Sequence, residues 1–201
     1  MDFVLPSRPV LSTLISGKGH YETVIEPLAQ ARRSVWIATA NLKELLVADE
    51  RLVPGRRRTR AKRNYRSVLA VMDELAERGV ELRILHARLP SQAFRDALDK
   101  FPRLWKGGLA LRMCPRVHLK VVIVDGIQLY LGSANWTGAG LGAKGEHRRN
   151  FELGILTEDE RWLDAVQALY EHIWSGGPCA ACKLRHACEA PLDLRPTSSS
   201  R

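Results

Sequence analysis

Apolar and polar residues alternate along this chain in blocks that predict strands and helices in turn. Short apolar runs bounded by turn residues predict strands, and runs with apolar residues three or four positions apart predict helices. The predicted strands lie within residues 34–40, 80–85, 109–113 and 121–131, and the predicted helices within residues 21–33, 67–78 and 91–100. This order predicts an α/β sandwich, in which a mixed central sheet is flanked by helices.

A longer helix is predicted towards the C-terminal end. Thr157 and Glu160 have the spacing of a capping box at its start. One apolar stripe follows at helical spacing, formed by Trp162, Val166, Leu169 and Ile173. The Gly-Gly-Pro sequence at residues 176–178 predicts its end.

The segment that precedes and forms the strand pair at residues 121–131 carries the most informative polar residues. An apolar run is followed by Asp125-Gly126, which favours the positive backbone angles of a tight turn, and then by a second apolar run. Alternate residues of a strand share a face, so we expect His118 and Lys120 to point the same way, about 6 to 7 Å apart. A base or nucleophile would then lie beside a fixed cation.

The returning strand of this hairpin brings further polar groups to the same edge. Ser133 and Asn135 provide a hydroxyl and an amide that can hydrogen-bond phosphate oxygens. Gly132 allows close backbone approach. Imidazole, ammonium, hydroxyl and amide together favour a site for phosphoryl chemistry.

These residues resemble the signature of the phospholipase D superfamily. The signature is His-x-Lys, four residues, Asp, six residues and Gly-Ser-x-Asn, and every fixed position is present. Asn150-Phe151-Glu152 is similar to the family's downstream Asn-x-Glu. The resemblance implies a phospholipase D-like fold and a catalytic set of His118, Lys120, Ser133, Asn135 and Glu152, with Glu152 orienting the histidine. Asp125 is interpreted as mainly structural, holding the loop of the motif in shape.

The resemblance also implies a mechanism that uses two histidines and no metal for catalysis. His118 would attack phosphorus to give a phosphohistidine, while a second histidine protonates the leaving oxygen and later activates water. The chain has six histidines but only one His-x-Lys copy of the motif. A twofold homodimer would supply the second histidine, because its axis can bring His118 of each subunit together.

Charge and composition are consistent with one such subunit that binds a polyanion. The chain has 201 residues, of which 31 are basic and 22 acidic, giving a formal charge of +9. Six cations lie within residues 56–63, namely Arg56, Arg57, Arg58, Arg60, Lys62 and Arg63. A solvated loop is the simplest interpretation of such a run. Beside a phosphodiesterase site it favours a nucleic-acid contact, to DNA or RNA. Without a long apolar run or a signal-peptide pattern, the expected location is the cytoplasm.

Three of the four cysteines lie close together after the long helix, and the fourth precedes the motif. They are Cys179, Cys182, Cys188 and Cys114. This triplet resembles the C-terminal one that holds a [4Fe-4S] cluster with an upstream cysteine in RecB-type and CRISPR-associated nucleases. Zinc bound by the triplet together with His186 or Cys114 is equally compatible with the ligand types. Free thiols without a metal remain a third alternative.

The sequence therefore predicts a catalytic domain over residues 1–177, a cysteine-rich metal-binding tail over residues 178–190 and a disordered end over residues 191–201. The predicted function is that of a metal-independent endonuclease. A phospholipid hydrolase of the cardiolipin-cleaving type is the alternative enzyme, because the same chemistry cleaves any phosphodiester. An alternative of another class is a nucleic-acid-binding subunit of a larger defence or repair complex.

Overall fold

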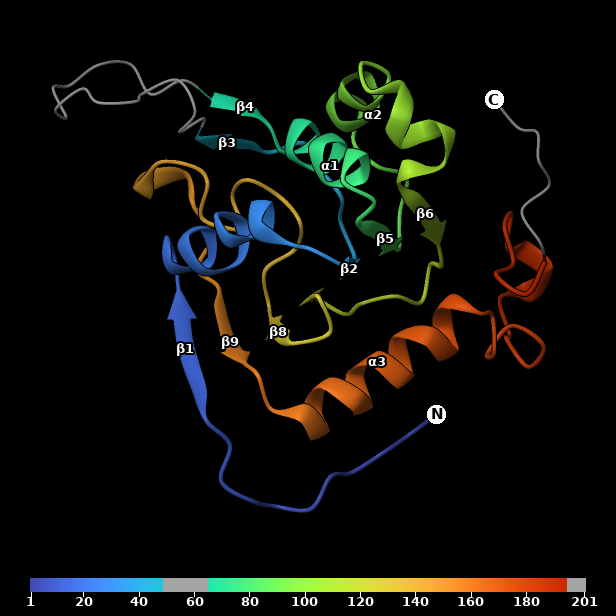
Figure 1. Cartoon of the computed structure of the whole chain (residues 1–201). Coiled ribbons are helices and arrows are strands. Elements are labelled where there is room, and N and C mark those ends of the chain that lie inside the picture. Colours follow the sequence, from blue (N-terminus) through green and yellow to red (C-terminus); the bar gives the residue numbers. More distant parts are fainter. Residues whose placement is uncertain (49–64, 195–201) are drawn as a thin grey trace, which may run out of the picture.

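A seven-stranded mixed sheet organises the computed structural model, which describes residues 1–48 and 65–194. The strand order is β1-β9-β8-β7-β2-β5-β6 (Figure 1). The strands are β1 (Ser12–Ser16), β2 (Ser34–Thr39), β5 (Glu81–His86), β6 (Ala110–Met113), β7 (Val121–Val124), β8 (Gln128–Gly132) and β9 (Leu153–Thr157). A separate pair is formed by β3 (Leu46–Ala48) and β4 (Tyr65–Ser67). The basic run at residues 56–63 lies between these two strands, outside the described residues.

Helices cover both faces of the large sheet (Figure 1). On one face, α1 (Val68–Glu77) and α2 (Gln92–Leu98) contribute to a hydrophobic cluster that includes Ile37 of β2. On the other face, α3 (Glu160–Trp174) contributes Leu163 and Tyr170 to a second cluster. Shorter helical turns are Tyr21–Ile25, Pro27–Gln30, Leu104–Gly108, Glu146–Arg148 and Arg185–Ala187. The predicted α/β sandwich is confirmed.

Two details of the helices differ from the sequence predictions. The predicted helix at residues 21–33 is instead a π-helical turn followed by a 3₁₀ turn that starts at Pro27, which has no backbone N–H for a continuing helix. The residue that caps α3 is Asp159 rather than Thr157, since Asp159 Oδ1 accepts a 3.0 Å hydrogen bond from the Trp162 N–H. The Thr157 hydroxyl donates to the Leu11 carbonyl.

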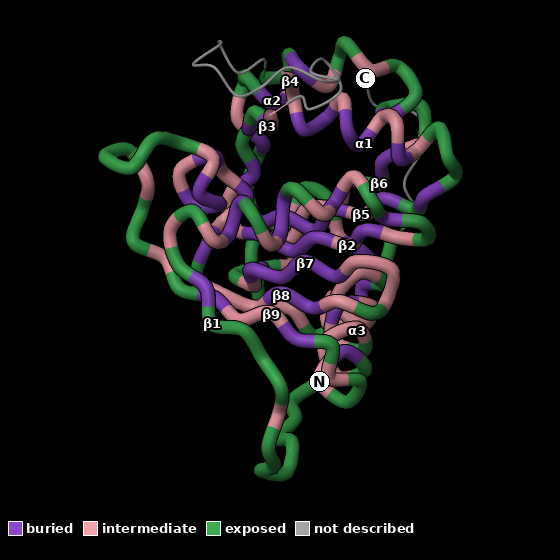
Figure 2. Tube along the Cα trace, turned by 60° about the vertical axis from the view of Figure 1, so that its left-hand side comes forward, coloured by how far each residue is buried: buried purple, intermediate pink, exposed green. Residues whose placement is uncertain are grey.

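The predicted hairpin is confirmed as β7 and β8, which pair antiparallel with Val121 opposite Leu131. Strand β7 also pairs antiparallel with β2, and β8 with β9. The C-terminal ends of β2 and β8 and the N-terminal ends of β7 and β9 therefore meet at one end of the sheet. Figure 2 shows that the middle strands are buried along much of their length. All the motif residues except Asp125 lie at this shared end.

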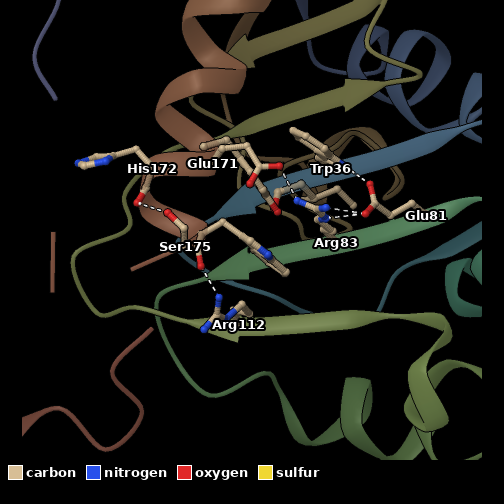
Figure 3. A network of polar contacts seen from close by, with 10 residues as sticks. Trp36, Glu81, Arg83, Arg112, Glu171, His172 and Ser175 are labelled. Atoms are coloured by element: carbon tan, nitrogen blue, oxygen red, sulfur yellow. Dashed lines mark hydrogen bonds and ion pairs between the residues drawn. The ribbon is translucent and has the colours of Figure 1, made fainter. Parts of the chain in front are cut away.

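A half-buried arginine that packs against aromatic rings attaches the end of α3 to the sheet (Figure 3). The Arg83 guanidinium lies 4.6 Å from the Trp36 ring centroid and 5.4 Å from that of Trp174. It also donates 2.6 Å hydrogen bonds to carboxylates of Glu81 and Glu171. Charge pairing and cation–π contact together fix the last turn of α3 over β2 and β5.

In the part of the chain that the structure describes, no helix is long and apolar enough to cross a membrane.

Candidate active site

His118 and Lys120 lie in the extended segment that leads into β7, and their side chains meet. The Lys120 Nζ is 3.1 Å from each ring nitrogen of His118, and it donates a 2.8 Å hydrogen bond to the His118 carbonyl. His118 is exposed, whereas Lys120 is only 9% exposed. Burial lowers the pKa of Lys120, and the negative charge of Glu152 opposes that shift. The structure thus brings a solvent-facing imidazole against a fixed amine close to a carboxylate.

The Glu152 carboxylate is held by side chains from both sides of the β8–β9 connection. Ser133, directly after β8, donates its hydroxyl to Glu152 Oε2, and the Asn150 amide donates a 3.1 Å hydrogen bond to Oε1. The Ser133 hydroxyl also accepts a 3.1 Å hydrogen bond from the Leu153 N–H. Among the described residues, Glu152 has no hydrogen bond to the His118 ring. Ser133 therefore acts in this structure as a support for Glu152.

Asn135 connects the end of β8 to the end of β2. Its Oδ1 accepts hydrogen bonds from the Asn41 N–H at 3.1 Å, the Ala40 N–H at 3.2 Å and the Thr39 hydroxyl at 3.4 Å. These three donors fix which atom of the amide is the oxygen. The NH₂ group of Asn135 is then the part of the amide that remains to bind an anion.

Asp125 lies at the opposite end of β7, in the turn of the hairpin, with a φ of 56°. Its carboxylate accepts hydrogen bonds of 2.7 to 3.0 Å from the N–H groups of Arg32, Arg33 and Ser34, where β2 begins. Burial alone would raise the pKa of Asp125. The three N–H donors and the positive charge of the Arg33 side chain outweigh this effect, so the pKa of Asp125 is lowered. Asp125 therefore ties the hairpin to the central strand and is remote from His118.

The glycine of the Gly-Ser-x-Asn segment makes room for an aromatic ring. A Cβ atom at Gly132 would lie 2.3 Å from Tyr130 Oη, and one at Gly154 on the neighbouring strand would lie 2.4 Å from Tyr130 Cε2. Burial raises the pKa of Tyr130 to about 12. The two glycines thus allow a buried tyrosine to lie beneath the site, a role for Gly132 that the spacing of the motif does not reveal.

A second histidine lies behind the site, contributed by the turn that follows β1. His20 is completely buried, with its ring edge against Tyr130 at a centroid distance of 5.7 Å. Its Nδ1 is 3.2 Å from the Gly17 carbonyl, and its Nε2 has no hydrogen-bond partner among the residues that the structure describes. Burial lowers the pKa of His20, partly offset by the Gly17 carbonyl and the charge of Glu152. No sequence signal marks this residue, because it is separated from the motif by about a hundred positions.

None of the four cysteines forms a disulfide, and all of them line one cavity at the C-terminal tail. Burial raises the pKa of the Cys114 thiol, and its neighbours Cys179 and Cys188 contribute in the same direction. Arg116 donates a 3.7 Å hydrogen bond to Cys182 Sγ. Across the described residues, no three histidine, cysteine, aspartate or glutamate side chains converge closely enough to hold a metal ion. His186 is exposed and does not line this cavity.

A family described as cardiolipin synthase, PLD-like domain matches residues 24–174, which is more than half of the chain. The matched region begins in the π-helical turn Tyr21–Ile25 and runs to the end of α3. It includes the whole of the His-x-Lys motif and the downstream Asn-x-Glu. Comparison with curated proteins gives no match.

Solved structures of low sequence identity have the same fold. NucT from Helicobacter pylori gives a TM-score of 0.54 at 18% identity, over 81% of this chain and 94% of that chain. Nuc from Salmonella typhimurium, described as a phospholipase D family member, gives 0.56 at 16% identity, over 82% and 95%. TrmBL2, described as an archaeal chromatin protein with a novel mode of DNA binding, gives 0.53 at 16% identity, over 82% and 52%. At these identities the likeness shows the fold, and it confirms the predicted phospholipase D-like architecture.

The position of Asp125 predicts a pH-dependent stability effect. We expect Asp125→Asn to lower the free energy of unfolding at pH 7 by about 1 to 3 kcal/mol, because the variant no longer offers a charged acceptor to the three N–H groups. A carboxyl whose pKa is lowered on folding stabilises the protein above about pH 3.9, and this stabilisation is lost as the pH falls through the folded pKa. Urea unfolding should therefore show a gap between wild type and variant that narrows in acid. Asp164→Asn, at an exposed position of α3, is the matched control; a gap of constant size at every pH would contradict the assignment.

Proposed function

This chain belongs to the cardiolipin synthase, PLD-like family of phosphodiester-cleaving enzymes, and from this premise we propose that it is an endonuclease that forms a phosphohistidine and works as a homodimer. One observation carries the proposal. The exposed His118 ring lies against the Lys120 amine, at the end of the sheet where the strands bring Asn135 and Glu152 as well. This is the arrangement that an attack on a phosphodiester needs.

In the proposed first step, a ring nitrogen of His118 attacks phosphorus. The nitrogen–phosphorus bond forms as the bond from phosphorus to the leaving oxygen breaks, and a second imidazole donates a proton to that oxygen. In the second step this imidazole takes a proton from water, and the resulting nucleophile cleaves the nitrogen–phosphorus bond. Lys120 and the NH₂ group of Asn135 would contact the non-bridging oxygens, where negative charge accumulates. Glu152, held by Ser133, would orient a catalytic imidazole.

The second imidazole is proposed to be His118 of a second copy of the chain. The motif occurs once in the sequence, and His20 is a poor donor to a leaving group because its ring is completely buried. Exposed apolar side chains beside the site support a second copy there. Leu14 is 72%, Leu153 60% and Phe151 fully exposed, on or next to the paired strands β1 and β9. Such a grouping is typical of a surface that is covered in the assembled protein.

Nucleic acid is the proposed substrate because the chain carries a large excess of positive charge. The formal charge is +9, and the connection that leads to Glu152 includes the exposed cations Lys144 and Arg148. In the sequence, the basic run at residues 56–63 contributes six further cations to this excess. A polyanion gains affinity from each phosphate that is neutralised. Membership of a larger defence or repair complex is compatible with this substrate.

One observation favours a second candidate, a phospholipid hydrolase. The description of the matched family names cardiolipin synthase, and cardiolipin contains phosphodiesters. Purified protein should therefore be incubated with labelled single- and double-stranded DNA, with RNA and with cardiolipin vesicles. Cleavage of nucleic acid alone supports the proposed substrate, whereas cleavage of cardiolipin alone replaces it with the second candidate. Tight nucleic-acid binding without any cleavage would identify a binding subunit instead.

Cleavage is expected to survive EDTA. Imidazoles provide the nucleophile and the acid, and Lys120 provides the positive charge that a divalent ion supplies in two-metal nucleases. His118→Ala should lower the cleavage rate by at least about a thousandfold, because it removes the nucleophile. His147→Ala, at an exposed position, is the matched control and should cleave normally. The histidine mechanism is wrong if EDTA stops cleavage by folded protein or if His118→Ala remains active.

Mixed dimers test whether the site is shared. If each site needs His118 from both subunits, a dimer of one wild-type and one His118→Ala chain is inactive. With equal amounts of freely exchanging chains, about a quarter of the dimers are fully wild type by random pairing in a twofold assembly. Activity should fall to about a quarter of the wild-type value on the same argument. A fall to one half, with exchange verified by mass spectrometry, would mean that each chain works alone and would direct attention to His20 as the acid.

The basic run is expected to contribute to binding and not to chemistry. Replacing its six cations by glutamine should weaken nucleic-acid binding. The slope of the logarithm of the binding constant against the logarithm of the salt concentration should become less steep by roughly 0.7 to 0.9 for each phosphate that is no longer neutralised. Hydrolysis of a small phosphodiester should hardly change. Lys106→Gln with Arg161→Gln is the control, since both are exposed and lie towards the other end of the sheet. If this slope is unchanged, the six cations do not contact phosphates, and the interpretation of the run as a solvated loop is correct.

A further inference from the structure

Every cysteine of the chain lines the same cavity, although the four come from two separate segments. Cys114 lies in the loop after β6, and the other three lie beyond the end of α3. The non-cysteine lining is mostly apolar or basic and consists of Met113, Pro115, Arg116, Leu184, Arg185, Ala190, Pro191 and Leu192. Four thiols that line one cavity from distant parts of a sequence, without forming a disulfide, are of the residue type that binds thiophilic metals.

The tail is closed into a loop that holds its cysteines against Cys114. The Arg112 guanidinium donates to the carbonyl of Trp174 at its start and to that of Leu192 at its end, and Figure 3 shows Arg112 below the end of α3. Gly176, with a φ of +80°, contacts the returning backbone so closely that a Cβ atom there would lie 2.2 Å from the Asp193 nitrogen. Leu192 is buried in the same hydrophobic cluster as α3. The boundary predicted at residue 190 thus falls inside a packed segment.

Little else in the tail can hold this loop in shape. Residues 175–194 contain one three-residue 3₁₀ turn and no strand. Leu184 and Leu194 are 46% and 57% exposed, so Leu192 is the main apolar anchor. An ion pair of 2.6 Å joins Arg185 to Asp193 at the surface, and exposed pairs stabilise weakly. A short segment with so small a core is typically organised by a metal or by disulfides.

We infer that Cys114, Cys179, Cys182 and Cys188 bind one structural metal centre through four thiolates. Each thiol releases its proton to solvent when it binds the metal. Arg116 hydrogen-bonds Cys182 Sγ, as expected of a group that orients a thiolate ligand. All four thiols line the one cavity, but among the described residues no three of them lie close enough together to hold a single metal ion. A polynuclear iron–sulfur cluster, which takes its thiolates around its perimeter, fits this better than a single zinc ion with Zn–S bonds of about 2.3 Å.

The proposed centre would also stabilise the catalytic segment. Cys114 and His118 are four positions apart in one loop, between β6 and β7. The Cys114 N–H donates a 2.8 Å hydrogen bond to the His86 carbonyl, and the Val117 N–H donates one of 2.9 Å to the Cys114 carbonyl. A metal bound to Cys114 would therefore fix the C-terminal tail and the segment that carries His118 to each other.

The test is metal analysis of the full-length protein, purified anaerobically without chelator. Iron with acid-labile sulfide and visible absorption would support an iron–sulfur centre, and about one zinc per chain in colourless protein would support the same site with zinc. Protein that contains neither metal would overturn the inference. These readouts do not depend on activity, so they are separate from any failure of the proposed nuclease function.

Cysteine variants test whether all four thiols are ligands. Cys114→Ser and Cys182→Ser should each reduce the bound metal to about a tenth or less of the wild-type content, because a three-thiolate remnant binds weakly. Ala181→Ser, at an exposed position between two of the ligands, is the control and should keep its metal. Full metal content in Cys114→Ser would overturn the four-thiolate assignment. If a variant does not fold, a thiol reagent can be added to native wild-type protein instead. Metal-bound thiols should react with the reagent only after the metal is removed. Immediate reaction of all four cysteine thiols would overturn the inference.

Discussion

The antiparallel register between β7 and β8 is the constraint on which the site depends. Because Val121 lies opposite Leu131, the residues before β7 and the residues after β8 come to the same end of the sheet. The Lys120 carbonyl accepts a 3.1 Å hydrogen bond from the Gly132 N–H and extends this pairing into the motif. A slip of one residue would turn every side chain of the hairpin to the opposite face. The contact between His118 and Lys120 and the support of Glu152 both depend on this one alignment.

Much of the fold follows from periodicity, and what periodicity misses has a physical cause. The strand at residues 34–40 could be predicted because it is a short, largely buried apolar run. The helices that begin after Ser67 and Ser91 could be predicted because each has apolar residues at helical spacing and a serine that caps its start. The edge strand β1 could not, since Ile15 is its only buried residue. The partition of residues 21–33 into two different turns depends on one proline and on packing against the sheet, and apolar spacing alone contains neither.

The residues of the candidate site could be predicted by spacing, but their partners could not. Spacing identifies Ser133 and Glu152 separately, whereas their hydrogen bond exists only because β8 and β9 are neighbours. His20 has no motif at all, and tertiary packing brings it behind Glu152. The convergence of Cys114 with the cysteine tail likewise depends on where α3 ends. Contacts between segments far apart in the sequence are properties of the fold, and a local pattern does not encode them.

The motif contains two kinds of residue, those that face the candidate site and one that holds the fold. His118 and Lys120 stand at the start of β7, whereas Asp125 stands at its end and acts on the backbone of β2. A chain without His118 but with Asp125 would lack the exposed imidazole and keep the hydrogen bonds that join the hairpin to β2. The two ends of this short strand can therefore be inherited independently. Such a protein would persist as a folded scaffold, open to selection for binding alone.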